Sequence, residues 1–163
     1  MNTSKSPKRH RLFNIRIKSP SAKVTKKFGE TLGLELRKKI PKVNGALVIS
    51  LRGELGSGKT TLIQGIARGL GLKRHIVSPT FLLMRVYAIA KKQKRKLLHI
   101  DAYRIATKKD AAILENKDFF NNPAHIVAVE WPERIPHLMR KRTIEITIKH
   151  GTSEHERSII MKT

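Results

Sequence analysis

A glycine-rich octapeptide carries the most specific chemical signal in this sequence. Gly53-Glu54-Leu55-Gly56-Ser57-Gly58-Lys59-Thr60 matches the pattern G-x-x-x-x-G-K-[ST] at every fixed position. Small residues let consecutive backbone N–H groups point at phosphate oxygens, and a following helix adds the positive end of its dipole. Lys59 is expected to reach the β- and γ-phosphates, and the Thr60 hydroxyl to bind Mg²⁺. We predict a nucleotide site here. The alternative is a structural glycine turn followed by an ordinary exposed lysine.

Two carboxylates are candidates for binding the metal that accompanies a nucleotide. An apolar segment at 97–100 ends at Asp101, and another at 126–129 ends at Glu130. Ligands of open α/β sheets gather at the carboxyl ends of strands, so two such strands point into one crevice. We predict a functional role for both acids. The alternatives are a turn or N-cap role for Asp101 and a surface position for Glu130. His99 is interpreted as a packing residue.

The elements around the glycine-rich loop fit an α/β protein. Residues 46–51 form a continuous apolar run, typical of a strand buried on both faces, and residues 61–70 have the apolar periodicity of a helix. Further strands are predicted at 12–18, 81–90, 96–101, 126–130, 143–149 and 157–161, the last two as a hairpin. Strands interleaved with helices predict a single three-layer α/β domain of the P-loop type, with a mostly parallel central sheet and antiparallel edge strands.

Two further helices complete this prediction. The first begins near Ser19-Pro20-Ser21 and ends before Pro41. Its apolar residues recur every four positions and predict one buried stripe, formed by Val24, Phe28, Leu32 and Leu36. The other helix is predicted over 107–120, with Thr107 and Asp110 as a capping box.

Composition narrows the class of protein. The chain has 35 Lys and Arg against 12 Asp and Glu, a formal net charge of +23, and no cysteine. Absence of cysteine excludes a disulfide framework, a thiolate nucleophile and a cysteine-ligated metal. No apolar run approaches the roughly 18 residues of a membrane span, so we expect a cytoplasmic protein without a membrane partner. The positive charge indicates either a polyanion partner or a compositional bias on a solvated surface.

The chain is predicted to divide into a short arm and one domain. Residues 1–11 are basic and lack periodicity, so we expect a disordered arm, with a transit peptide as the alternative. Residues 12–163 are assigned to the P-loop domain.

Four segments, in this order, resemble the TsaE (YjeE) family of small bacterial P-loop ATPases. They are Leu51–Thr61, Val77–Phe81, His99–Arg104 and Val129–Pro132. The S-P-T-F, D-x-Y-R and V-E-W-P patterns within them are far more specific than the glycine-rich loop alone. Thr25 with Gly29 also resembles the N-terminal segment that lies beside the nucleotide in this family.

The resemblance implies a cytoplasmic ATPase that acts with the TsaB–TsaD assembly in forming N6-threonylcarbamoyladenosine on tRNA, with tRNA contact possible through the assembly or the basic surface. It implies ATP and Mg²⁺ as cofactors and catalytic roles for Lys59, Asp101 and Glu130. The implied metal ligands are Thr60, Asp101 and Glu130. The residues expected at the nucleotide are Thr25, Glu54, Leu55, Gly56, Ser57, Gly58, Lys59, Thr60, Thr61, Thr80 and Trp131.

Two other functions use the same features. A small-molecule or nucleoside kinase has the same phosphate loop but needs an acceptor pocket and a lid. An RNA-binding module would use the basic surface and keep the loop as structure, although the basic runs contain no aromatic residue for base stacking.

Arg104 and Arg134 are candidate arginine fingers, with structural ion pairing as the alternative. We expect slow hydrolysis by the isolated chain and stimulation by the partner.

Overall fold

One mixed β-sheet organises the part of the chain that the structure describes. The computed structural model describes residues 14–38, 44–90, 95–115, 117–140 and 143–163, so the predicted arm at 1–11 lies outside the described residues. The strand order is β1-β7-β6-β2-β5-β4-β3. The strands are β1 (Asn14–Ser19), β2 (Leu47–Arg52), β3 (Met84–Ala90), β4 (Arg95–Asp101), β5 (His125–Glu130), β6 (Thr143–His150) and β7 (Arg157–Lys162).

The centre of the sheet is parallel and its edges are antiparallel. Strands β6, β2, β5 and β4 run parallel to one another, whereas β3 pairs antiparallel with β4. At the other edge β6 and β7 form the predicted hairpin, and β1 adds to β7. The register places Glu130 beside both Leu51 and Asp101. The glycine-rich loop after β2 and the ends of β4 and β5 therefore meet at one edge of the sheet.

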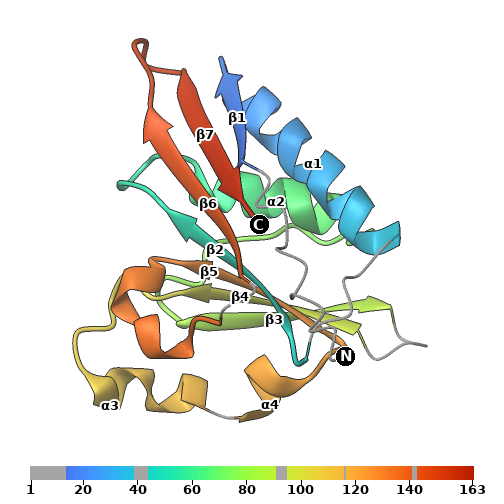
Figure 1. Cartoon of the computed structure of the whole chain (residues 1–163), viewed down its shortest axis with the longest axis vertical. Coiled ribbons are helices and arrows are strands. Elements are labelled where there is room, and N and C mark those ends of the chain that lie inside the picture. The colour runs from blue at the N-terminus through green and yellow to red at the C-terminus, as the bar shows by residue number, and fades with distance from the viewer. Residues whose placement is uncertain (1–13, 39–43, 91–94, 116, 141–142) are drawn as a thin grey trace, which may run out of the picture.

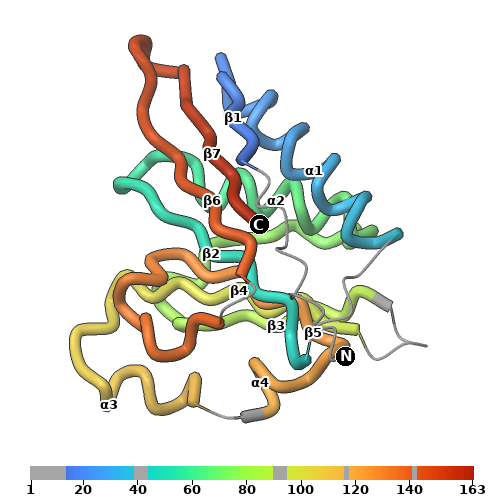
Figure 2. Tube along the Cα trace, in the orientation of Figure 1, coloured from blue at the N-terminus to red at the C-terminus, as the bar shows by residue number. Residues whose placement is uncertain are grey.

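Helices cover both faces of the sheet, as the three-layer prediction requires. Figure 1 shows α1 (Ala22–Lys38) and α2 (Lys59–Gly69) on one face, and α3 (Lys108–Ala111) with α4 (Lys117–Asn121) on the other. Three 3₁₀ helices, η1 (Ala112–Glu115), η2 (Pro132–Arg134) and η3 (Pro136–Leu138), also belong to the described chain. Alternate residues of β2 enter two cores, with Ile49 facing α1 and α2 and Val48 facing the opposite layer. The path of the chain through both layers can be followed in Figure 2.

Glycines set the contact between α1 and α2. A Cβ on Gly29 would lie 2.4 Å from the carbonyl oxygen of Leu62, and one on Gly65 would lie 2.1 Å from that of Lys26. The buried residues of α1 are Thr25, Gly29, Gly33 and Leu36. The predicted apolar stripe was therefore wrong in part, because Val24 is exposed while Phe28 and Leu32 are only partly buried. Hydrophobicity could not locate this face, since glycine packs by its lack of a side chain.

Two predicted elements are shorter than expected. The strand predicted from residue 81 begins at Met84, because the Leu82 N–H donates to the Pro79 carbonyl at 2.7 Å in a turn and Leu83 has φ of +64°. The helix predicted over 107–120 begins with the expected Thr107 capping box but is broken into α3, η1 and α4.

Ala111, at the end of α3, and Leu114, in η1, both belong to the core on this face of the sheet. No helix in the described ranges is long and apolar enough to cross a membrane.

Candidate nucleotide-binding site

The glycine-rich loop joins β2 to α2 through backbone conformations that favour glycine. Gly56 has φ of +73° and Gly58 has φ of +103°, both in the left-handed region. Gly53 is required for space as well, because a Cβ there would lie 2.4 Å from the Ile148 carbonyl oxygen. The loop ends at the first residue of α2, Lys59. This is the predicted strand, glycine turn and helix start, the geometry that presents backbone N–H groups to phosphate.

Lys59 is buried and held by the loop that precedes it. Its Nζ donates to the carbonyl oxygens of Gly53 and Glu54, both at 2.8 Å, and lies 4.1 Å from the centre of the Trp131 ring. Burial lowers the pKa of Lys59, and the charges of Glu130 and Asp101 act in the opposite direction. The two carbonyls supply oxygen partners for an ammonium group that is otherwise removed from water.

Glu130 connects the start of α2 to the sheet. Its Oε1 accepts a hydrogen bond from the Thr60 hydroxyl at 2.8 Å and lies 2.8 Å from His99 Nε2. Both Glu130 and His99 are buried. The carboxylate is therefore fixed beside the hydroxyl with which it was predicted to share a metal.

Asp101 is held by the segment between α2 and β3. Its Oδ2 accepts hydrogen bonds from Thr80 Oγ1 at 2.5 Å and Ser78 Oγ at 3.1 Å, and its Oδ1 accepts one from the Tyr103 backbone N–H at 3.0 Å. Asp101 is the cross-strand partner of Glu130, so the two acids lie side by side at the ends of β4 and β5. Thr80, predicted to sense a phosphate, contacts the predicted metal ligand directly.

Trp131 forms the wall of the site beside Lys59. It has a left-handed backbone, with φ of +60° and ψ of +51°, directly after β5. The backbone N–H of Trp131 donates to the Leu51 carbonyl at 3.2 Å, and the centre of its ring lies 5.1 Å from the centre of the Tyr103 ring. The turn places an aromatic face against the lysine cation, an arrangement that is attractive electrostatically.

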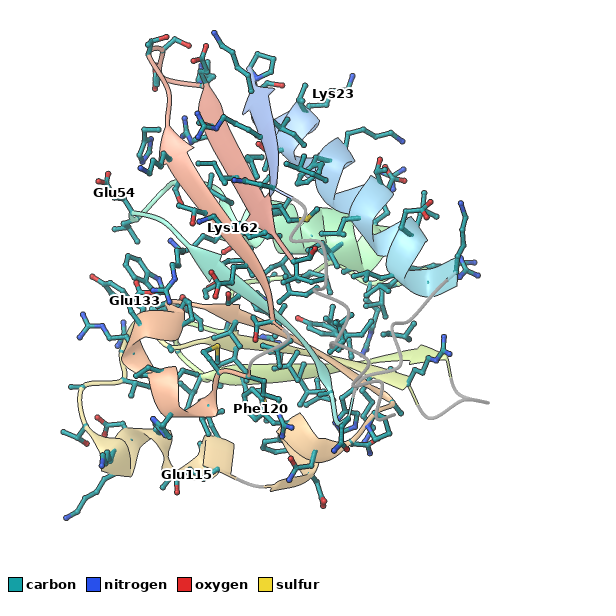
Figure 3. All side chains as sticks on the ribbon, in the orientation of Figure 1. Lys23, Glu54, Glu115, Phe120, Glu133 and Lys162 are labelled. Atoms are coloured by element: carbon teal, nitrogen blue, oxygen red, sulfur yellow. The ribbon has the colours of Figure 1, made fainter. Side chains whose placement is uncertain are left out.

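Two cavities adjoin the loop and share Gly56, Gly58 and Thr61. The larger, about 290 Å³, is lined by Leu55, Gly56, Gly58, Lys59, Thr60, Thr61, Ser78, Thr80, Asp101, Tyr103, Glu130 and Trp131. The smaller, about 140 Å³, is lined by Ala22, Thr25, Gly56, Ser57, Gly58, Thr61, His155 and Arg157. The structure thus brings together every predicted site residue except the Glu54 side chain, which is 86% exposed and projects from the outer edge in Figure 3.

Thr25 reaches this site from α1. Its hydroxyl lies 2.8 Å from Ser19 Oγ, and its methyl group lies 3.9 Å from the position of a Cβ on Gly58. Ser57, opposite, is fully buried, and its hydroxyl has no hydrogen-bond partner in the structure. An unpaired buried hydroxyl beside a cavity is a group that a bound ligand would satisfy.

Sequence reasoning missed six further residues of the site: Ala22 and His155 in the lining of the smaller cavity, and the four residues described next. Arg157, from β7, donates through Nε to the Ser57 carbonyl at 3.1 Å and through Nη2 to the Gly56 carbonyl at 3.3 Å. Nothing in its local sequence marks that role. Ser78 and Tyr103 lie inside the segments that carry the resemblance and could have been included. His99 was read as packing, although strand alternation puts its side chain on the same face as Asp101.

One of the two candidate arginine fingers, Arg104, stacks on an aromatic ring. The Arg104 guanidinium lies over the Phe81 ring, 4.5 Å from its centre. Neither Arg104 nor Arg134 forms an ion pair with any residue in the described ranges. Structural ion pairing, the alternative role predicted for these two arginines, is therefore not observed among the described residues.

The oxygen donors of the site suit Mg²⁺. Among the described residues, no group of three or more His, Cys, Asp or Glu is arranged to hold a metal by itself. Thr60, Asp101 and Glu130 instead offer one hydroxyl and two carboxylates beside the phosphate loop. Mg²⁺ is usually bound by one or two carboxylates together with substrate phosphates, so the residues present fit this ion.

The fold and the site define a class of protein and then a family. A parallel-centred sheet, a glycine-rich strand-to-helix loop and two acids at neighbouring strand ends are the features of a P-loop protein. The sequence model described as "Threonylcarbamoyl adenosine biosynthesis protein TsaE" matches residues 19–159, and the chain therefore belongs to the TsaE family of threonylcarbamoyladenosine biosynthesis proteins.

Individual relatives agree with this assignment. The Haemophilus influenzae "tRNA threonylcarbamoyladenosine biosynthesis protein TsaE" is 32% identical over 138 residues, covering 85% of this chain and 81% of the relative. The protein of the same name from Synechocystis sp. is 44% identical over 96 residues, covering 56% of this chain and 57% of the relative. The crystal structure of Bacillus subtilis YdiB matches 94% of this chain and 88% of its own, with a TM-score of 0.66 and 23% identity, and supports the fold.

Proposed function

We propose that this chain binds ATP with Mg²⁺ and hydrolyses it in the cytoplasm, in the biosynthesis of threonylcarbamoyladenosine in tRNA, with the TsaB–TsaD assembly as its partner. One observation supports the proposed hydrolysis of ATP: Lys59, Thr60, Asp101 and Glu130 line one cavity beside the glycine-rich loop. Family membership and the names of the relatives support the place in tRNA modification.

The chain's own groups act by position and charge. Lys59 and the loop N–H groups would neutralise charge on the phosphate oxygens, which is the main demand of phosphoryl transfer. Thr60, Asp101 and Glu130 would hold Mg²⁺, which supplies further charge neutralisation when bound. Glu130 Oε2 accepts no hydrogen bond from a described residue, because Thr60 and His99 both use Oε1. We assign to Oε2 the orientation of the attacking water.

Slow hydrolysis by the isolated chain follows from the surroundings of the cavity. No arginine lines the cavity that contains Lys59, and Arg104 is engaged by Phe81. An additional cation that stabilises the transition state would have to come from a rearrangement or from the partner, and such cations raise phosphoryl-transfer rates strongly.

The test measures the product and the partner together. With γ-³²P-ATP we expect label in inorganic phosphate, accelerated by TsaB and TsaD, and complex formation in native mass spectra that differs between ATP and ADP. Lys59→Ala should abolish the phosphate signal, whereas the exposed Lys109→Ala should keep it. Label in an organic acceptor would identify a kinase. Partner binding that ignores the nucleotide would leave only a general nucleotidase.

A further inference from the structure

A third cavity lies at the other end of α2 from the glycine-rich loop. Its volume is about 650 Å³, more than twice that of the cavity around Lys59. Its lining, which we call the basic groove, consists of Lys26, Arg37, Gln64, Arg68, Gly71, Leu72, Lys73, Arg74, His75 and Ile76. Five of these ten residues are Lys or Arg, and none is Asp or Glu. The composition favours an anionic occupant.

The charge of the basic groove is only slightly compensated. Glu30 lies 3.4 Å from Arg68 but also 3.2 Å from Lys27, so one acid is shared by two cations. Arg37, Lys73 and Arg74 are exposed and form no ion pair with a described residue. Lys26 likewise forms no ion pair with a described residue, so among the described residues only Arg68 of the five cations is ion-paired, and the three exposed unpaired cations are Arg37, Lys73 and Arg74.

The dipoles of α1 and α2 explain why two of the five cations lie at the groove, and leave the other three unexplained. Cations in the last turn of a helix interact favourably with its dipole, which accounts for Arg37 in α1 and Arg68 in α2. Lys73 and Arg74 lie beyond the end of α2, and Lys26 is in the first half of α1. Their position on the groove needs another reason.

The wall formed by residues 71–76 is fixed in place. Gln64 Nε2 donates to the Ile76 carbonyl at 2.9 Å, and the Leu72 N–H donates to the Ala67 carbonyl at 3.0 Å. Gly71 has φ of +91°, and a Cβ there would lie 3.2 Å from Arg37 Nη1, so glycine leaves room for the guanidinium. The cations are thus presented by a backbone that a ligand need not order.

We infer that the basic groove binds the phosphate backbone of RNA. Lys26 and Arg37 are eleven residues apart in α1, which corresponds to about 16 Å along the helix axis. A phosphate backbone that runs along α1 therefore meets cations at both ends of the groove. Arginine, which supplies three of the five cations, binds phosphate through two parallel hydrogen bonds.

The basic groove is expected to bind the phosphate backbone of RNA without distinguishing its base sequence. No Phe, Tyr or Trp belongs to its lining, and His75 is the one ring in it, so base stacking contributes little there. Phosphate contacts fix position on the nucleic acid without selecting bases. Binding of RNA goes beyond ATP hydrolysis, which does not require it, and the proposed function enters only in the choice of tRNA as the natural RNA.

The test compares two variants of the full chain with equal charge. The groove variant is Arg37→Gln, Lys73→Gln and Arg74→Gln. The control variant is Lys108→Gln, Lys109→Gln and Lys149→Gln, three exposed lysines on α3 and β6, elements that do not border the groove. Fluorescence anisotropy with an unmodified tRNA transcript is measured between 50 and 300 mM salt, and a duplex DNA and anionic vesicles serve as other polyanions.

We expect the groove variant to bind tRNA at least tenfold more weakly than the control variant. The slope of log affinity against log salt should flatten by about 2–3, because three phosphate contacts are lost. A charge-preserving variant, Arg37→Lys with Arg74→Lys, should bind tRNA more tightly than the groove variant, because it keeps the positive charges and loses only the paired hydrogen bonds of arginine. An unchanged circular dichroism spectrum of the groove variant shows that its loss of affinity is not misfolding. Equal losses in both triple variants, or stronger binding to vesicles than to tRNA, would overturn the inference.

Hydrolysis of ATP separates this inference from the proposed function. The groove variant should hydrolyse ATP at the rate of the unaltered chain, because the groove lies apart from Lys59. Groove-dependent tRNA binding without ATP hydrolysis would refute the proposed ATPase and leave the groove intact. ATP hydrolysis without tRNA binding would refute only the inference that the groove binds RNA.

Discussion

His99 Nε2 and Glu130 Oε1 lie 2.8 Å apart in the interior of the sheet, and the Thr60 hydroxyl donates to the same oxygen. The histidine is fully buried, and its Nδ1 has no partner in the structure. One oxygen of the carboxylate is thus used for positioning, and the other remains for chemistry. Partners of this kind commonly change metal affinity or activity by 10–100-fold when removed.

Removing the positioning contact should lower turnover more than binding. We expect His99→Leu to reduce kcat for ATP by roughly tenfold with KM nearly unchanged, whereas His99→Gln, which keeps a donor, should retain more activity. Steady-state kinetics in the Glu130→Gln background provides the control. There His99→Leu should have little further effect, and a full additional tenfold loss would show that His99 acts independently of Glu130.

Lys59→Ala and Asp101→Ala should each lower ATP hydrolysis by at least about 100-fold at saturating Mg-ATP, because Lys59 would neutralise phosphate charge directly and Asp101 would hold the Mg²⁺ that neutralises more of it. Circular dichroism should show an unchanged fold, since both side chains border a cavity. Turnover close to that of the unaltered chain in either variant would refute the assigned role.

Trp131 is the only tryptophan in the chain, and its ring contacts both Lys59 and Tyr103 at the cavity. A nucleotide that draws the ammonium group away from the ring changes the ring's surroundings. Intrinsic fluorescence should therefore change on addition of Mg-ATP and saturate with its concentration. The same titration of Lys59→Ala should give a much smaller signal, and an unchanged spectrum for the unaltered chain would contradict the proposed site.

Gly65→Ala should destabilise the protein although alanine is the better helix former. Helix propensity alone predicts a gain of about 1 kcal/mol. The added Cβ would lie 2.1 Å from the Lys26 carbonyl oxygen, so α1 and α2 must separate, and we expect a net loss of about 2–3 kcal/mol in the free energy of unfolding. Urea denaturation measures it. Lys23→Ala, at the exposed start of α1 in Figure 3, should change stability by less than about 0.5 kcal/mol.

The hydrogen bond from Lys18 lowers the pKa of Glu156 below its ordinary value of 4.5. A carboxyl group with a lowered folded-state pKa contributes stability fully above 4.5 and loses it as the pH falls through the folded value. The stability advantage over Glu156→Gln should therefore be constant near pH 7 and shrink below pH 4.5. Denaturation midpoints between pH 3 and 7 measure it, and Lys18→Met should shrink the advantage above pH 4.5, where the unaltered chain has it in full.

The parts of the site that were predictable are those fixed by local chemistry. The glycine-rich loop carries its conformation in its own residues, and Asp101 and Glu130 each follow an apolar strand that must end where the sheet ends. The order of the strands was not readable, because pairing depends on contacts between distant segments. The same limit hid Arg157, which is separated from Ser57 by 100 residues.

Other errors had a different physical origin. The apolar stripe of α1 was misplaced because its buried face is made by Gly29 and Gly33, which give no hydrophobic signal. His99 was read as packing because a buried histidine in a strand gives no sign of its hydrogen-bond partner. That partner, Glu130, comes from another strand.

Arg157 supports the Gly56 and Ser57 carbonyls from β7, which is synthesised after the other strands that the structure describes. A ribosome adds roughly 5–20 residues per second, so the loop emerges about 5–20 s before the arginine that supports it. During that interval a nascent chain contains the glycine-rich loop but lacks the hydrogen bonds from Arg157 to its carbonyls. We therefore expect full affinity for nucleotide only after β7 has been synthesised and has joined the sheet.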